Sequence, residues 1–194
     1  MAERKRDPAE GTLEQVGGRW RLRFVRELRH PPEKVWRALT EEEHLAAWFP
    51  TTLEGELRPG AAGTALEFRH RGHDFPPVTG ELIACEPPRL LEFTWGFSGD
   101  PADAPESSRF ELEPRGDGCV LTFTTTYDAV GKSARDAAGW HVCFDALGRH
   151  LAGEPTTGGD PSAWKPLNRR YAERFGPASA TIGPPAAMKD YLDD

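Results

Sequence analysis

The chain has 194 residues, of which 24 are basic and 31 acidic, giving a formal net charge of −7. Its length fits one folded domain with short additions, and its acidic balance opposes nucleic-acid binding, which depends on Lys and Arg neutralising phosphates. No apolar run approaches the roughly 18 residues of a membrane-spanning helix. The N-terminus does not resemble a signal peptide, and the cysteines are too widely spaced for a disulfide framework. We therefore expect a cytoplasmic protein with no nucleic-acid partner and no membrane span.

Residues 1–11 are charged and contain Pro and Gly, so we expect a flexible N-terminal arm. Two alternating runs follow, 12–16 and 19–28, and Gly17-Gly18 separates them. This arrangement predicts a β-hairpin, because both turn residues need a positive φ. The free edge expected at 12–16 would allow a homodimer.

The second run of this hairpin is predicted to be half-buried, with Trp20, Leu22 and Phe24 on its inner face. The expected outer face is a basic, solvated row, for which the alternative is a patch for an anion or a partner. The row consists of Arg19, Arg21, Arg23, Arg26 and Arg29.

Two short helices are expected next. Pro31-Pro32 ends the strand, and the spacing of apolar residues predicts a helix over 32–39 with Pro and Glu in its first turn. Thr40 followed by Glu43 forms a candidate capping box for a second helix over 41–49, which Pro50 would end.

From residue 51 to about 128 the apolar period changes from 3.6 to 2, and Pro- and Gly-rich turns divide the sequence into short runs. Such runs indicate an antiparallel meander in which neighbours in sequence pair. The predicted strands are 53–57, 64–71, 78–85, 89–97, 107–113 and 119–127.

The helical period returns over 132–151, where about 20 residues would span roughly 30 Å and cross a whole sheet. Its apolar stripe is Ala137, Trp140, His141, Phe144, Leu147 and Leu151. Residues 153–194 are expected to contribute a linker, a short helix over 166–175 and a loosely held tail. The domain itself is expected to span residues 12–152.

Three segments of this sequence resemble one known family. They are PEKVWRALT at 32–40 with LAAWF at 45–49, GEL at 80–82 with EPPRLLEFTW at 86–95, and Gly139-Trp140 with Leu147 and Leu151. The sequence resembles the Hsp90 ATPase activator homologue 1-like proteins. These belong to the helix-grip (SRPBCC) class, with START lipid-binding domains, Bet v 1-type carriers and polyketide cyclases. The resemblance implies an α+β fold in which a curved antiparallel sheet grips the C-terminal helix, with a pocket between them.

The leading functional hypothesis is therefore that a small, mostly apolar ligand binds under the last helix, without an obligatory cofactor. The alternative for the same inner-face side chains is ordinary core packing. The candidate ligand-binding residues are Trp36, Trp48, Phe49, Phe68, His70, Trp95, Phe97, Phe110, Phe123, Thr125, Tyr127, Trp140, His141 and Phe144.

Two other classes of function stay open. One is a cyclase- or hydrolase-like enzyme with His70, Tyr127 or His141 as acid or base. The other is a protein-interaction module linked to a chaperone, although no segment matches the Asn-rich Trp motif of the chaperone-binding domain found in eukaryotic activators.

No metal site is predicted from the sequence. The run His70-Arg71-Gly72-His73-Asp74 offers potential ligands, but its spacing fits a hairpin turn better than a metal motif. His141 and Cys143 lie two apart on the predicted helix, so they point in different directions and cannot pair as base and nucleophile.

Overall fold

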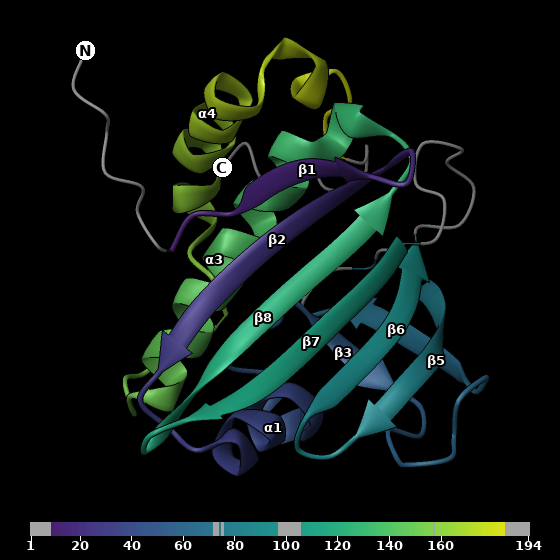
Figure 1. Ribbon diagram of the computed structural model, residues 1–194, viewed down its shortest axis with the longest axis vertical. Helices are drawn as coiled ribbons and strands as arrows, with labels where there is room; N and C mark the ends of the chain where they lie inside the picture. Colours follow the sequence, from purple (N-terminus) through teal and green to yellow (C-terminus); the bar gives the residue numbers. More distant parts are fainter. Residues whose placement is uncertain (1–8, 72–73, 75, 97–105, 157, 185–194) are drawn as a thin grey trace.

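The computed structural model describes residues 9–71, 74, 76–96, 106–156 and 158–184. Its centre is one antiparallel sheet of eight strands in the order β1-β2-β8-β7-β6-β5-β4-β3 (Figure 1). The strands are β1 Thr12–Val16, β2 Arg19–Leu28, β3 Thr51–Glu54, β4 Ala65–His70, β5 Val78–Glu86, β6 Leu90–Gly96, β7 Glu106–Arg115 and β8 Gly118–Tyr127. The meander from β3 to β8 pairs in sequence order, as predicted.

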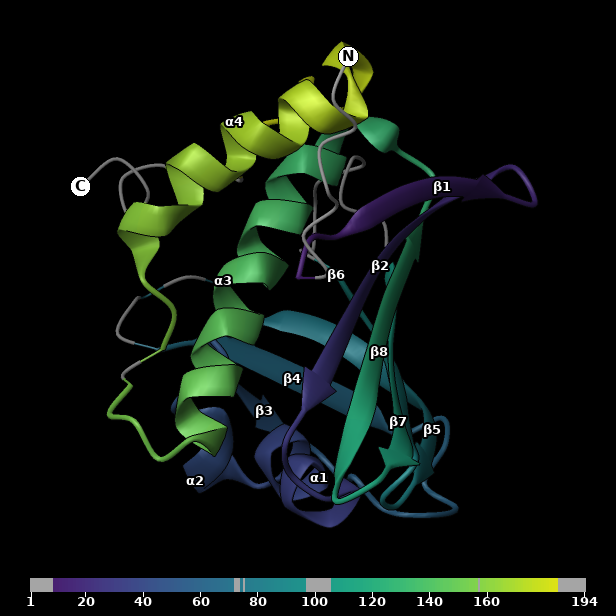
Figure 2. The same cartoon turned by 60° about the vertical axis from the view of Figure 1, so that its left-hand side comes forward.

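The helices lie mainly on one side of this sheet. The long helix α3 runs across its inner face, α1 and α2 lie at the lower end of the space between them, and α4 crosses the upper part of α3 (Figure 2). The α-helices are α1 Pro32–Thr40, α2 Glu42–Leu45, α3 Ser133–Leu151 and α4 Trp164–Phe175, and the 3-10 turns are η2 Val130–Lys132, η3 Pro161–Ala163 and η4 Pro177–Ala180. The α+β helix-grip arrangement is confirmed.

The predicted hairpin is confirmed. Gly17 and Gly18 have φ values of 59° and 82°, and they join β1 to β2 in antiparallel register. β1 forms one edge of the sheet, and Val16 on it is 40% exposed. Pairing of this edge with a second copy of the chain stays a prediction.

The second predicted helix is much shorter than expected, since α2 covers only Glu42–Leu45. The capping-box prediction was wrong, because the Thr40 hydroxyl donates to the Trp36 carbonyl at 2.9 Å within α1. Glu41, in extended conformation, begins α2 with no side-chain cap. The hydroxyl of Thr40 therefore bonds back into the first helix and does not cap the second.

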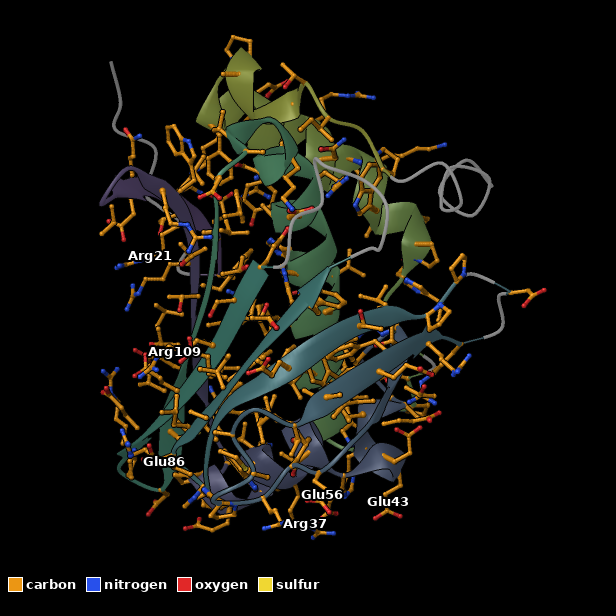
Figure 3. All side chains as sticks on the ribbon, turned by 90° about the vertical axis from the view of Figure 1, so that its right-hand side faces the viewer. Arg21, Arg37, Glu43, Glu56, Glu86 and Arg109 are labelled. Atoms are coloured by element: carbon orange, nitrogen blue, oxygen red, sulfur yellow. The ribbon has the colours of Figure 1, made fainter. Side chains whose placement is uncertain are left out.

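The outer face of the sheet carries charged side chains that pair with one another. Figure 3 places Arg21 and Arg109 on the side of the sheet away from α3. Arg109 contacts Glu92 at 2.7 Å and Glu111 at 2.8 Å, and these bonds raise its pKa further above its usual range. Such pairs are typical of a solvated face and contribute little stability each.

The predicted basic row needs one correction. Arg26 has the same parity along β2 as Leu22 and Phe24, and its guanidinium lies over the rings of Phe24 and Phe144, at 5.2 and 5.5 Å from their centroids. Residues two apart on a strand share a face. Arg26 thus lies toward α3, not in the outer row.

Residues 10 and 11 and helix α4 pack against the domain, whereas residues 1–8 of the expected arm and 185–194 of the expected tail lie outside the described residues. The Gly11 N–H donates to the Tyr171 hydroxyl at 2.9 Å, and Glu10 pairs with Arg170 and Arg174 of α4. Tyr171 is only 1% exposed and belongs to the hydrophobic core. Local sequence patterns could not predict the contact between Gly11 and Tyr171, because these two residues are 160 positions apart in the chain.

Replacing Tyr171 with phenylalanine is expected to destabilise the protein by about 1–3 kcal/mol, because the buried Gly11 N–H would lose its acceptor. For a chain of this size that loss corresponds to about 2–4 °C in Tm per kcal/mol. Thermal unfolding followed by circular dichroism measures the effect. An unchanged Tm would show that water replaces the hydroxyl and that the N-terminal contact is weak.

Among the described residues, no helix has both the length and the apolar character needed to cross a membrane.

Candidate functional site

Aromatic side chains pack tightly between α3 and the sheet. Trp140, near the middle of α3, lies 4.1 Å from the ring of Phe123 and 5.9 Å from that of Phe49, measured between centroids. Trp95 on β6 meets Trp140 edge-on at 5.8 Å. These offset and edge-on contacts are the geometries that aromatic pairs prefer.

Most of the residues predicted from the sequence to form a site lie in this interior. Trp36, His70 and Trp95 are half-buried, and Phe97 lies outside the described residues. The buried members are Trp48, Phe49, Phe68, Phe110, Phe123, Thr125, Tyr127, Trp140, His141 and Phe144.

The end of the interior next to α1 and α2 is closely packed. A space of about 10 Å³ remains there, which is no more than one water molecule needs. It is lined by Leu39, Leu45, Trp48, Phe49, Leu53, Leu91, Phe93 and Phe110. Trp48 is fixed here by a hydrogen bond from its ring N–H to the Ala38 carbonyl, at 2.7 Å. This end of the interior is therefore part of the packed hydrophobic core.

The opposite end of the interior is polar. Lys132, in η2, is 1% exposed and pairs with the carboxylate of Glu106, the first residue of β7, whose side chain is 12% exposed. The Thr125 hydroxyl donates to the same carboxylate at 3.2 Å. Burying such a pair away from water is expensive, and the pair is weak evidence for stability by itself.

Two further hydroxyl groups lie beside this pair. Ser108 and Tyr127 are buried, and neither Oγ of Ser108 nor Oη of Tyr127 meets a hydrogen-bond partner among the described residues. The ammonium of Lys132 lies 5.4 Å from the centre of the Tyr127 ring. We call Glu106, Ser108, Thr125, Tyr127 and Lys132 the polar cluster.

Strand register brings the polar cluster next to the aromatic interior. Trp95 pairs across from Glu106, and Phe93 pairs across from Ser108. Exposure rises along β6 from the buried Phe93 to the half-buried Trp95. The polar cluster therefore lies where the aromatic interior approaches the surface.

The Tyr127 phenol is neutral near neutral pH. Burial, with a smaller effect from the nearby charge of Asp136, raises the pKa of Tyr127 well above its usual range. Asp136 itself pairs with Arg135 at 2.8 Å, and both side chains are mostly buried. A neutral phenol in this position can donate a hydrogen bond, but it cannot act as a base.

The two histidines proposed as acid or base lie in other surroundings. His141, on α3, makes a 2.7 Å hydrogen bond through Nδ1 to the Tyr171 hydroxyl of α4, and its Nε2 lies 3.5 Å from Asp145. His70 is at the end of β4, and Gly72 and His73 of the run that follows it lie outside the described residues. His141 is thus engaged by the C-terminal helix.

An open groove of about 640 Å³ lies between the second half of β2 and the C-terminal half of α3. Its walls mix charges of both signs with a few apolar side chains, so it suits a mostly apolar ligand poorly. The lining residues are Ala9, Arg26, Glu27, Leu28, Val142, Phe144, Asp145, Gly148, Arg149, Glu154, Asp160 and Ala163.

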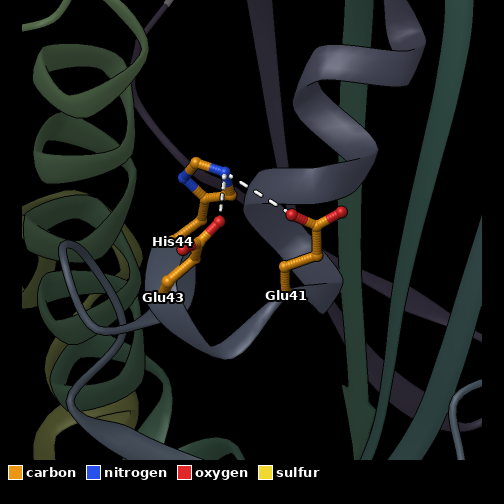
Figure 4. A group of neighbouring side chains, drawn as sticks. All are labelled: Glu41, Glu43 and His44. Atoms are coloured by element: carbon orange, nitrogen blue, oxygen red, sulfur yellow. Dashed lines mark ion pairs between the residues drawn. The ribbon is translucent and has the colours of Figure 1, made fainter.

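A small group of carboxylates around a histidine lies between α1 and α2 (Figure 4). His44 Nε2 is 3.6 Å from an oxygen of Glu41 and 3.6 Å from one of Glu43. The guanidinium of Arg37 already contacts this group, at 2.9 Å from Glu41. The guanidinium also lies 4.0 Å from Glu43, so the group is an ion-pair network that includes Arg37.

Sequence reasoning missed three members of the polar cluster: Glu106, Ser108 and Lys132. The alternation along the strand that places Phe110 inward also places Ser108 and Glu106 inward, so the sequence could have predicted the positions of these two residues. Lys132 had none, because its burial depends on the path of the chain after β8.

The family model for the activator of Hsp90 ATPase homolog 1-like proteins matches residues 29–152. No match was found among curated protein sequences. The fold is similar to several solved structures, which at these identities establishes the fold alone.

CalU16 from Micromonospora echinospora has a TM-score of 0.66 and 22% identity, and the alignment covers 89% of this chain and 98% of that one. A conserved protein of unknown function from Enterococcus faecalis, EF2215, has a TM-score of 0.66 and 21% identity over 85% of this chain and 90% of its own. The Aha1 dimer from Colwellia psychrerythraea has a TM-score of 0.56 and 19% identity, and the alignment covers 68% of this chain and 95% of that one.

Proposed function

Since the chain belongs to the activator of Hsp90 ATPase homolog 1-like family, we propose that it binds a small, mostly apolar molecule between α3 and the sheet, at the end where Trp95 approaches the surface. The ligand's apolar part contacts Trp95 and Trp140, and its polar end contacts the polar cluster. The observation that carries this proposal is the pair of buried hydroxyls, Ser108 and Tyr127, without partners among the described residues.

Such hydroxyls are unfavourable in a packed interior. A buried polar atom without a partner costs about 1–3 kcal/mol, and most native proteins pair nearly all such atoms. A ligand oxygen placed between Ser108 and Tyr127 would supply the missing bonds. The adjacent indole rings of Trp95 and Trp140 would contact the rest of the molecule, as in pockets that are mostly apolar with a few placed polar groups.

The proposal predicts opposite effects for two tyrosine variants. Tyr127→Phe removes a hydroxyl that makes no hydrogen bond of normal geometry among the described residues, although the Ser133 hydroxyl lies nearby. We therefore expect little change in stability and a three- to tenfold lower affinity for the ligand. Tyr171→Phe removes a hydroxyl that Gly11 and His141 use, so we expect lower stability and unchanged ligand affinity. The two variants make the same chemical change, and each is the control for the other.

The measurement is a thermal-shift screen of the purified protein with fatty acids, sterols, flavonoids and aromatic polyketides, followed by calorimetric titration of the hits. A ligand present at about 100 times its Kd stabilises the native state by about 2.7 kcal/mol. If no compound shifts the Tm, or if Tyr127→Phe leaves the affinity of every hit unchanged, the proposed site is wrong.

A further inference from the structure

The polar cluster also indicates which kind of polar group its ligand carries, an inference that rests on the proposed function. Glu106 and Lys132 carry opposite charges and pair with each other, and Lys132 is almost completely shielded from water. The hydroxyl of Thr125 gives the carboxylate a further hydrogen bond. Neither charge therefore needs an ionic group from the ligand.

The next charges along the chain are also matched. Arg135 and Asp136, at the start of α3, pair at 2.8 Å, and Arg135 donates in addition to the Gly183 carbonyl at 2.8 Å. The described charges around Tyr127 are thus two acids and two bases. These four charges pair with one another, and burying a charged ligand group beside them would carry a desolvation cost.

The polar atoms here that make no hydrogen bond to the described residues are two uncharged hydroxyls and one carboxylate oxygen that can accept a hydrogen bond. Ser108 Oγ and Tyr127 Oη each offer a hydroxyl, and Asp136 Oδ2 is a buried acceptor without a hydrogen-bond partner among the described residues. Both of these hydroxyls, the neutral phenol of Tyr127 included, can donate and accept hydrogen bonds. A ligand hydroxyl or carbonyl oxygen would match this set.

We propose that the ligand is an uncharged aromatic molecule carrying a hydroxyl or carbonyl group, and that the site selects it over the corresponding carboxylate and ammonium compounds. The aromatic part follows from Trp95 and Trp140, whose rings approach each other edge-on beside the polar cluster. The uncharged polar end follows from the internal pairing of Glu106 with Lys132.

The test compares compounds that share one ring system. At neutral pH, 2-naphthol and 2-acetylnaphthalene are uncharged, 2-naphthoate is an anion and 2-naphthylmethylamine is a cation. Isothermal titration of the full chain should give Kd values at least tenfold lower for the two uncharged compounds. Charged compounds that bind as tightly as the neutral ones would overturn this inference and leave the proposed function standing. Binding by none of the four would count against both.

A charge variant strengthens the test. Glu106→Gln keeps the shape of the side chain and removes the carboxylate that pairs with Lys132. The affinity for 2-naphthoate should therefore rise at least tenfold relative to the affinity for 2-naphthol. Circular dichroism first checks that the variant is folded. A folded variant with the wild-type order of affinities would contradict the inference, and the wild-type comparison decides the matter if the variant does not fold.

Discussion

Replacing Trp140 with alanine is expected to lower the free energy of unfolding by about 3–5 kcal/mol, as large-to-small substitutions of buried aromatic residues do. The indole ring contacts Phe49, Phe110 and Phe123, with centroids 4.1 to 5.9 Å away. Neighbours on both the helix and the sheet would have to move to fill the space. A cavity would therefore remain, and its surface adds to the loss of apolar burial.

Urea unfolding at equilibrium, followed by far-ultraviolet circular dichroism, measures this loss. The matched control is Trp36→Ala, which removes the same side chain from a half-buried position on α1, and its effect should be clearly smaller. Equal losses for the two variants would show that the centre of α3 repacks easily. A small loss at Trp140 would mean that this part of the interior is already hollow.

The second large effect is expected at the buried ion pair. Removing one residue of the pair leaves the other charge without this partner in a place that water scarcely reaches, and such changes cost about 3–5 kcal/mol. Lys132→Met and Glu106→Gln should each show a loss of this order. The double variant should recover most of it, because replacing both charges with uncharged groups of similar volume is often neutral or stabilising.

A double-mutant cycle separates this coupling from other effects of the substitutions. The control pair is Arg19 and Asp128, which also form an ion pair but whose side chains are 44% and 75% exposed. Exposed pairs contribute about 0–1 kcal/mol, so the cycle there should give little coupling. A coupling between Lys132 and Glu106 no larger than this would show that water reaches their site.

The inward face of β8 illustrates what sequence could predict about the site. Phe123, Thr125 and Tyr127 were expected on one face, and all three are buried. Alternation along a strand is a local property, because successive side chains point to opposite faces. The same rule predicted that Trp95 points inward. It could not predict that Trp95 is partly exposed, because exposure depends on which other segments cover the side chain.

The position of His141 shows where such reasoning stops. It lies on the buried stripe of α3, as predicted, yet its hydrogen bond goes to Tyr171 of α4 and not to the sheet interior. A helical stripe is wide enough to contact two different neighbours. Only the packing of α4 onto α3 decides which neighbour each residue of the stripe meets.

The sequence by itself determined the order of strands and helices, the Gly17-Gly18 hairpin and the aromatic inner faces. These features depend on periodicity and turn chemistry within a few residues. Tertiary structure alone decided the pairing of β2 with β8, the docking of Gly11 on Tyr171 and the contact between Glu106 and Lys132. Those contacts join distant segments, and their free energy depends on burial that no local pattern encodes.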